Sequence, residues 1–197
     1  MEPFEILFAE STKIHGHICP GQVIGVRLAM LGLREIGIDD PKGNDRKKVY
    51  VFVELDRCAT DAIQSVTGCS MGKRSLRFVD NGVMAATFVN LETGVAVRVT
   101  ALEESREASK NYCPEILEKR KRQLEAYKIM PEEELYKVER VRVTIPEYNM
   151  PGGPMSRVQC EACGDWVQNK REINQEGRIL CRGCGEGRYY QLVDNVD

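Results

Sequence analysis

Apolar residues recur at helical spacing in the first part of the chain, where they predict a short amphipathic helix over 4–13. A second helix, from 20 to about 37, is apolar nearly all round, so we expect it to be buried. The run 49–55 is rich in β-branched and aromatic residues and predicts a central strand. A third helix is expected over 58–67, directly after that strand.

Three short strands are expected next, over 75–80, 83–90 and 94–101, with turns at 80–82 and 92–94. The resulting order is α-α-β-α-β-β-β. This order favours an α+β layer over a doubly wound parallel sheet.

The stretch 103–137 is helical in pattern and strongly charged, and Pro114 and Pro131 divide it. We interpret it as solvated helices that pack on one face. The expected packing face comprises Leu117, Leu124 and Tyr127. Alternating apolar residues over 141–145 predict a further strand.

A connector rich in Pro and Gly follows at 146–155. It divides the expected organisation into an α+β domain over 1–145, with its helical extension, and a small domain over 156–197.

Cysteine usage changes this picture, because the chain has 8 Cys but only 2 His. The N-terminus lacks the features of a signal peptide, and no apolar run is long enough to span a membrane. We therefore expect a cytoplasmic protein with reduced thiols, in which metal binding explains the cysteines better than disulfides do. A net charge of -2 argues against a generic nucleic-acid binder.

Two Cys-x-x-Cys pairs lie in the small domain: Cys160 with Cys163, and Cys181 with Cys184. This spacing is typical of a four-thiolate zinc ribbon; a rubredoxin-like iron site is the alternative. Because this small segment has few apolar residues to bury, metal binding would supply the free energy that stabilises its fold. A closed four-thiolate site leaves no open position, which indicates a structural role.

A second cluster, His15-x-His17-x-Cys19, precedes the second helix, and Cys58 begins the third. In an extended loop, residues 15, 17 and 19 would point to one side. Imidazole and thiolate together suit zinc, iron, nickel or copper. The alternative is that Cys58 and Cys69 are small buried hydrophobic residues and that the histidines cap loops.

The segment 68–73 resembles a phosphate-binding loop but fails the Walker pattern, because only three residues separate its glycines. Nucleotide hydrolysis is therefore rejected. A weak anion contact through Lys73 stays open.

Three motifs together resemble the FmdE family of formylmethanofuran dehydrogenase components. They are the segments 15–21 with Gly25 and Arg27, 58–64 and 67–73. The resemblance implies an α-β-α-β-β-β core with a mixed sheet and a homodimer. It also implies association with a molybdenum or tungsten pterin enzyme that reduces carbon dioxide onto methanofuran, a reaction that FmdE does not itself carry. Where the family usually has Gly-Lys-Gly-Asn-Leu, this chain has Gly72-Lys73-Arg74-Ser75-Leu76, so Arg74 and Ser75 depart from the family pattern.

The resemblance also implies a second metal, zinc, iron or nickel, held by His17, Cys19 and Cys58, with His15 and Cys69 as neighbours. Three hypotheses follow. The chain is a metal-binding accessory protein of one-carbon metabolism and methanogenesis, an oxidoreductase component without the catalytic molybdopterin. Alternatively, it is a stand-alone metalloenzyme, with Lys73 or Asp61 assisting. The third hypothesis is a zinc-ribbon module that binds a protein or nucleic acid.

Overall fold

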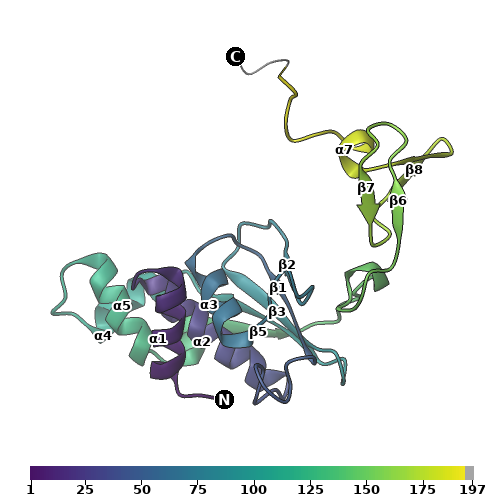
Figure 1. Cartoon of the computed structure of the whole chain (residues 1–197). Helices are drawn as coiled ribbons and strands as arrows, with labels where there is room; N and C mark the ends of the chain where they lie inside the picture. Colours follow the sequence, from purple (N-terminus) through teal and green to yellow (C-terminus); the bar gives the residue numbers. More distant parts are fainter. Residues whose placement is uncertain (194–197) are drawn as a thin grey trace. The chain divides into compact units, whose positions relative to one another are not determined.

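The computed structural model describes residues 1–193, which fall into two compact units, one over 1–144 and one beginning at Ile145. The first unit is built on a mixed five-stranded sheet of order β2-β1-β3-β4-β5 (Figure 1). Only β1 and β2 pair in parallel; the other neighbours are antiparallel. The strands are β1 (Val49–Val53), β2 (Leu76–Phe78), β3 (Ala85–Asn90), β4 (Ala96–Ala101) and β5 (Tyr136–Arg140).

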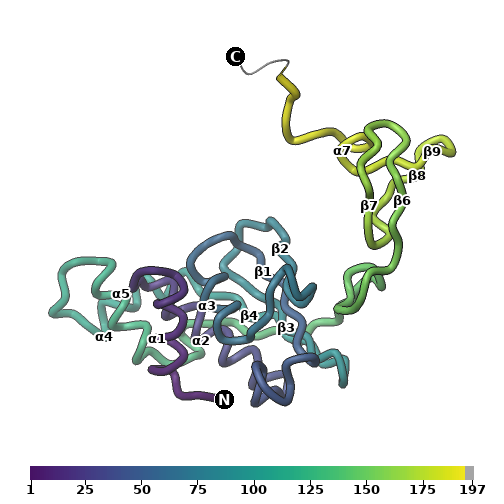
Figure 2. The backbone as a smooth tube through the Cα atoms, in the orientation of Figure 1, coloured from purple at the N-terminus to yellow at the C-terminus, as the bar shows by residue number. Residues whose placement is uncertain are grey.

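The helices of this unit are α1 (Phe4–His15), α2 (Pro20–Glu35), α3 (Cys58–Thr67), α4 (Ser105–Tyr112), α5 (Lys119–Ile129) and α6 (Glu132–Leu135). Helix α2 packs on β3 and β4, α1, α3 and α5 pack against α2, and α4 packs against α5; the path of the chain through the helices can be followed in Figure 2. The predicted α+β class and mixed sheet are confirmed, and α3 has the predicted bounds. In the described part of the chain, no helix is both long and apolar enough to cross a membrane.

The core lies between α2 and the middle of the sheet. Val51, Phe88 and Val97 form a row of paired positions across β1, β3 and β4, and all three are fully buried. Helix α2 comes so close that a Cβ on Gly32 would lie 2.2 Å from the Phe88 ring. Burial of this apolar row stabilises the sheet and fixes the height of α2 above it.

Helices α2 and α3 also touch through a glycine. A Cβ on Gly25 would lie 2.6 Å from the Cβ of Ala62 and 2.7 Å from the backbone of Ala59. Only glycine permits this approach. The two helices are therefore held against each other near their N-terminal ends.

Helix α5 is fixed to α2 by one side chain. Arg27 donates hydrogen bonds to the carbonyls of Tyr127 and Met130, at 2.6 and 2.7 Å. These carbonyls lie in the last turn of α5 and just beyond it, where they have no partner within the helix. The guanidinium thus caps α5 and holds its C-terminal end on the core.

Three expectations for this unit are wrong. The last strand lies at Tyr136–Arg140 rather than at 141–145, because β4 offers hydrogen-bonding partners only as far as Val141. Residues 80–82 do not close a hairpin, because β1 lies between β2 and β3 and the loop crosses its end. Leu117 is 88% exposed, whereas Leu124 and Tyr127 do pack on the core as predicted.

The second unit consists of two small hairpins and a short helix. Its elements are β6 (Arg157–Gln159), β7 (Trp166–Gln168), β8 (Ile173–Gln175), β9 (Arg178–Leu180) and α7 (Arg182–Gly185), preceded by a 3-10 turn at Glu147–Asn149. Cys160 and Cys163 lie in the turn between β6 and β7. Cys181 and Cys184 lie where β9 passes into α7.

Candidate metal centres

Four side chains of the first unit converge on one point. One donor atom from each of His15, His17, Cys19 and Cys58 lies within 4.8 Å of the others. The structure therefore gathers the three predicted ligands and the predicted neighbour His15. Cys69 is not in this group: it is buried, and its thiol donates to the carbonyl of Val49 at 3.6 Å.

The two histidines reach the site by a reversal of the chain, not by the extended loop expected from the sequence. His15 is the last residue of α1, and Gly16 ends that helix with a φ of 88°. The left-handed conformation at Gly16 turns the chain back, so that the imidazole rings of His15 and His17 lie 4.3 Å apart between centroids.

Both cysteines stand at helix N-termini. Cys19 is the N-cap of α2, and Cys58 is the first residue of α3. The positive end of each helix dipole favours the thiolate form that binds metals. Gly21 leaves room for them, since a Cβ there would lie 3.0 Å from the Cβ of Cys58 and 3.8 Å from the sulfur of Cys19.

A buried hydrogen-bond chain fixes the backbone of Cys58. The amide of Gln22 donates to the carbonyl of Cys58 at 2.5 Å, and the hydroxyl of Ser11 donates to the oxygen of Gln22. Gln22 and Ser11 are both fully buried. Gln22 thereby ties α1, α2 and α3 together beside the cluster, a role that nothing in the local sequence signals.

Asp61 orients the imidazole of His15. Nδ1 of His15 lies 2.7 Å from a carboxylate oxygen of Asp61, while Nε2 faces the sulfur of Cys19 at 4.0 Å. Carboxylates commonly hold a metal-binding histidine in this way, by accepting the proton of the nitrogen that does not bind. The arrangement frees Nε2 as the donor atom.

The donor set fits a transition metal. Two imidazoles and two thiols suit zinc, iron or nickel, which bind nitrogen and sulfur. Burial, reinforced by the neighbouring Cys19 thiol, raises the pKa of Cys58, and a bound cation would offset this. The predicted anion contact Lys73 lies elsewhere, where its ammonium donates to the carbonyl of Gly68 at 2.9 Å and closes the C-terminal end of α3.

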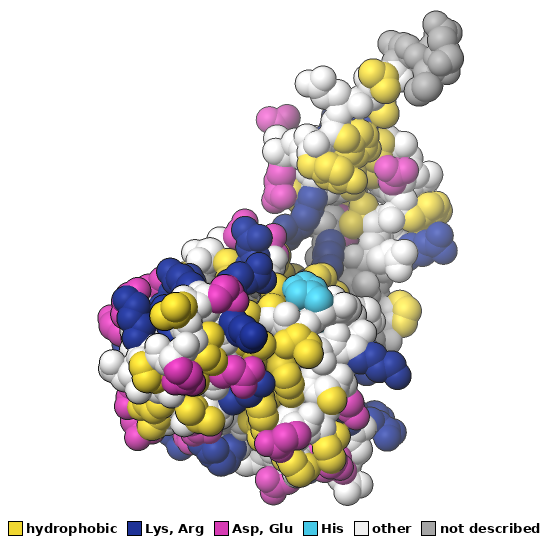
Figure 3. All heavy atoms as spheres, turned by 90° about the vertical axis from the view of Figure 1, so that its left-hand side faces the viewer, with side chains coloured by type: hydrophobic (Ala, Val, Ile, Leu, Met, Phe, Trp, Pro, Cys, Tyr) yellow, Lys and Arg dark blue, Asp and Glu magenta, His cyan; other side chains and the backbone are white. Residues whose placement is uncertain are grey.

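The cluster is accessible from solvent on one side. Cys19 is 3% exposed, whereas His17 is an exposed residue. Figure 3 shows histidine at the surface of the first unit, beside hydrophobic side chains. His17 is therefore the donor of the cluster most open to an incoming molecule.

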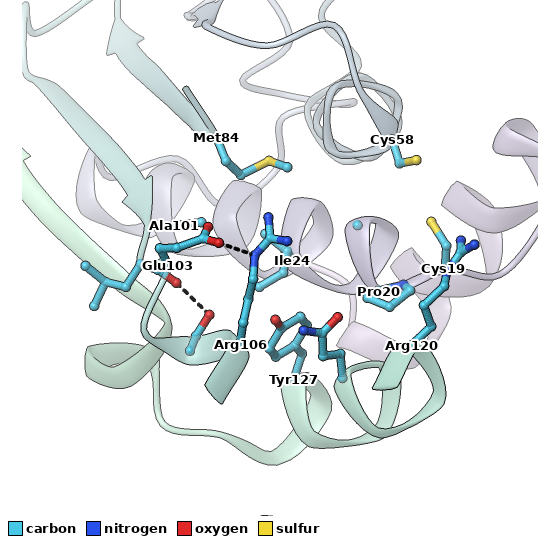
Figure 4. Close-up of a pocket in the computed structure, with 14 residues that line it drawn as sticks. Cys19, Pro20, Ile24, Cys58, Met84, Ala101, Glu103, Arg106, Arg120 and Tyr127 are labelled. Carbon is cyan, nitrogen blue, oxygen red and sulfur yellow. Dashed lines mark hydrogen bonds and ion pairs between the residues drawn. The ribbon is translucent and has the colours of Figure 1, made fainter. Parts of the chain in front are cut away.

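A pocket of about 310 Å³ adjoins the two cysteines. Cys19, Gly21 and Cys58 form one end, and α4 and α5 supply the opposite wall. Figure 4 shows Arg106 and Arg120 extending from these helices toward α2. Sequence reasoning missed this pocket, because its walls come from segments about a hundred residues apart.

The four cysteines of the second unit form another cluster, with all four sulfurs within 4.8 Å of one another. Ligands about 2.3 Å from a tetrahedral ion lie about 3.8 Å apart. The sulfurs of Cys163 and Cys181 are separated by 3.8 Å. The cluster therefore has the dimensions of a four-thiolate site and fits the predicted zinc ribbon.

Backbone hydrogen bonds and neighbouring thiols give two cysteines of this second cluster different pKa values. Backbone N–H groups, foremost that of Cys181, lower the pKa of Cys160 to about 6. A backbone N–H of Asp165 favours the thiolate of Cys163, but burial and the neighbouring thiols outweigh it and raise its pKa to about 12. A cation would remove the repulsion that keeps the second thiol protonated.

The fold and the two clusters define an α+β protein with two candidate metal centres. The family model described as "FmdE, Molybdenum formylmethanofuran dehydrogenase operon" matches residues 14–141, which contain all four donors of the first cluster. The chain belongs to this FmdE family.

Two individual proteins resemble the chain. A "Probable S-adenosyl-L-methionine-binding protein" of Archaeoglobus fulgidus is 30% identical over 207 residues, which cover 95% of this chain and 54% of that protein. The chain thus spans about half the length of this curated relative. A crystal structure of a tungsten formylmethanofuran dehydrogenase FmdE-like protein from Syntrophus aciditrophicus has the same fold, with a TM-score of 0.63, 95% coverage of both chains and 23% identity.

Proposed function

We propose that the chain is a metal-binding accessory protein of a molybdenum or tungsten pterin enzyme, with a reactive metal in the first cluster and a structural zinc in the second. The observation that carries the proposal is the contact between Asp61 and His15, at 2.7 Å. A carboxylate that directs a histidine toward two thiols is typical of a metal site. Histidines that only cap loops, or cysteines that are only buried hydrophobic residues, would not need this arrangement.

The first cluster suits a reactive ion. His15, Cys19 and Cys58 are the buried or half-buried donors, and His17 is the exposed one. Release of His17 leaves three protein ligands and one open position, as a catalytic or transfer site requires. At that position the metal would polarise or activate a bound group, while Asp61 and Gln22 keep His15 and Cys58 in place.

Metal analysis of the full chain tests this assignment. We expect two metal equivalents in the wild type and one in both Cys19→Ser and Cys160→Ser. Cys69→Ser serves as the matched control, because a serine hydroxyl can keep the hydrogen bond to Val49. Unchanged metal content in Cys19→Ser would refute the reactive site.

The pterin enzyme is proposed as partner because of the family to which the chain belongs. Copurification of molybdenum or tungsten enzyme components with the tagged native protein would support it. Homodimer formation is part of the same proposal and is measured by analytical ultracentrifugation.

A stand-alone enzyme that acts on a small molecule is the second candidate. The pocket of about 310 Å³ beside Cys19 and Cys58 favours it, since ligand sites begin at about this size. The name of the Archaeoglobus relative makes S-adenosyl-L-methionine one ligand to test, by equilibrium dialysis with the labelled compound.

A further inference from the structure

We propose that the pocket beside the first cluster binds a small organic carboxylate, with the acid group on Arg120 and Gln123 and the other end at the metal. This inference rests on the proposed function, because it gives the reactive metal a class of substrate. The walls of the pocket supply the argument.

Gln123 gives the first indication of a ligand. Its side chain lines the pocket and is only 8% exposed, yet its amide nitrogen has no hydrogen-bond partner among the described residues. A buried donor without a partner is unfavourable, and native proteins rarely keep one. An acceptor oxygen of a bound molecule would satisfy it.

Arg120 supplies the charge. Arg106, the other arginine of the pocket, already forms an ion pair with Glu103 at 2.8 Å. Within residues 1–193, the guanidinium of Arg120 makes no ion pair or hydrogen bond. Figure 4 shows this contrast: a dashed line joins Glu103 to Arg106, and none reaches Arg120. A free guanidinium beside an unpaired amide donor suits a carboxylate.

The rest of the pocket determines the shape of the molecule. Ile24, Met84 and Tyr127 give the same pocket an apolar lining. A divalent ion bound to two thiolates and two neutral imidazoles has no net charge, so the metal end does not repel an anion. The pocket therefore fits a short aliphatic chain with an acid group at one end and a metal-binding group at the other.

Matched thiols test the proposal on the cobalt-loaded full chain. The probes are 3-mercaptopropionate and 4-mercaptobutyrate, each compared by calorimetry with the alkanethiol that carries a methyl group in place of the carboxylate. We expect at least one acid to bind tenfold or more tightly than its alkanethiol. This preference should fall to less than threefold in Arg120→Gln and Gln123→Leu.

Lys121→Gln is the control, because Lys121 is the next residue of α5 and does not line the pocket. The preference should persist in it. Equal binding of acids and alkanethiols, or a preference that survives Arg120→Gln, would overturn the inference.

The outcome separates the two proposals. If cobalt enters the cluster and acids show no preference, the metal site stands and the carboxylate pocket fails. If no cobalt enters but calorimetry still shows an Arg120-dependent preference, the pocket stands and the metal function fails.

Discussion

The carboxylate of Asp61, in the first turn of α3, holds Nδ1 of His15 at the end of α1, at 2.7 Å. Two elements forty-six residues apart thus meet at one hydrogen bond behind a candidate metal ligand. Its contribution can be measured without changing any donor atom.

Replacing Asp61 with alanine should weaken metal binding about 10–100-fold, because His15 loses the acceptor that fixes its ring and tautomer. The metal affinity of Asp61→Asn should lie between those of the wild type and Asp61→Ala, since the amide oxygen can still accept the proton. Competition with a coloured chelator gives the affinities. Asp56→Ala, at an exposed acidic residue shortly before the same helix, should bind metal like the wild type.

Gly25→Ala should destabilise the first unit by about 1–3 kcal/mol, because the new methyl group would overlap Ala59 and Ala62. The separation of α2 and α3 should also lower metal content. Urea denaturation followed by circular dichroism measures the first effect. Gly72→Ala is the control, since a Cβ there meets nothing within 4 Å; equal stability of the two variants would contradict the close approach.

If the second unit holds the proposed zinc, it should lose its structure when that ion is removed. Trp166 is the sole tryptophan of the chain and lies in β7 next to the first cysteine pair, so its fluorescence reports on this unit alone. Cys160→Ser or a strong chelator should shift the emission to the red. An emission spectrum that is unchanged in Cys160→Ser and after addition of the chelator would show that the hairpins fold without an ion.

Because of Glu54, the free energy of unfolding of the first unit should decrease at acid pH. Hydrogen bonds from Arg98, and then from Asn81, lower the pKa of Glu54 below that of an unfolded chain. The stabilisation is therefore complete above about pH 4.3 and is lost as the pH falls through the folded pKa. Glu54→Gln should reduce the free energy of unfolding at neutral pH by roughly 1.5–3 kcal/mol and flatten this acid dependence.

Urea denaturation at several pH values measures this effect. Glu5→Gln removes an exposed carboxylate and should keep the wild-type pH profile. A Glu54→Gln profile that matches the wild type would mean that the ion pair with Arg98 contributes nothing.

Local patterns predicted the elements whose signals are local. The helix at 58–67 was expected with Gly68 as its C-cap, and the structure has Gly68 there with a φ of 68°. The cysteine spacing likewise predicted the four-sulfur cluster. No strand forms at 141–145, because pairing depends on where the antiparallel neighbour β4 begins, and that is not visible in the segment itself.

The sequence predicted which residues belong to the first cluster better than it predicted how they are arranged. The His-x-His-x-Cys spacing identified three donors, but their convergence depends on the turn at Gly16 and on the contact of α2 with α3 at Gly25. The role of Asp61 as the partner of His15 needed the three-dimensional structure, since the sequence offered it only as a helper in catalysis.

The glycine contact at Gly25 has a thermodynamic consequence for the ion. Because the positions of Cys19 and Cys58 are fixed by the packing of two helices, the cost of ordering the donors is met during folding. Metal affinity is then coupled to the integrity of the hydrophobic core. Titration of the ion into core variants distant from every donor would therefore measure, as a change in affinity, how firmly those two helices are held.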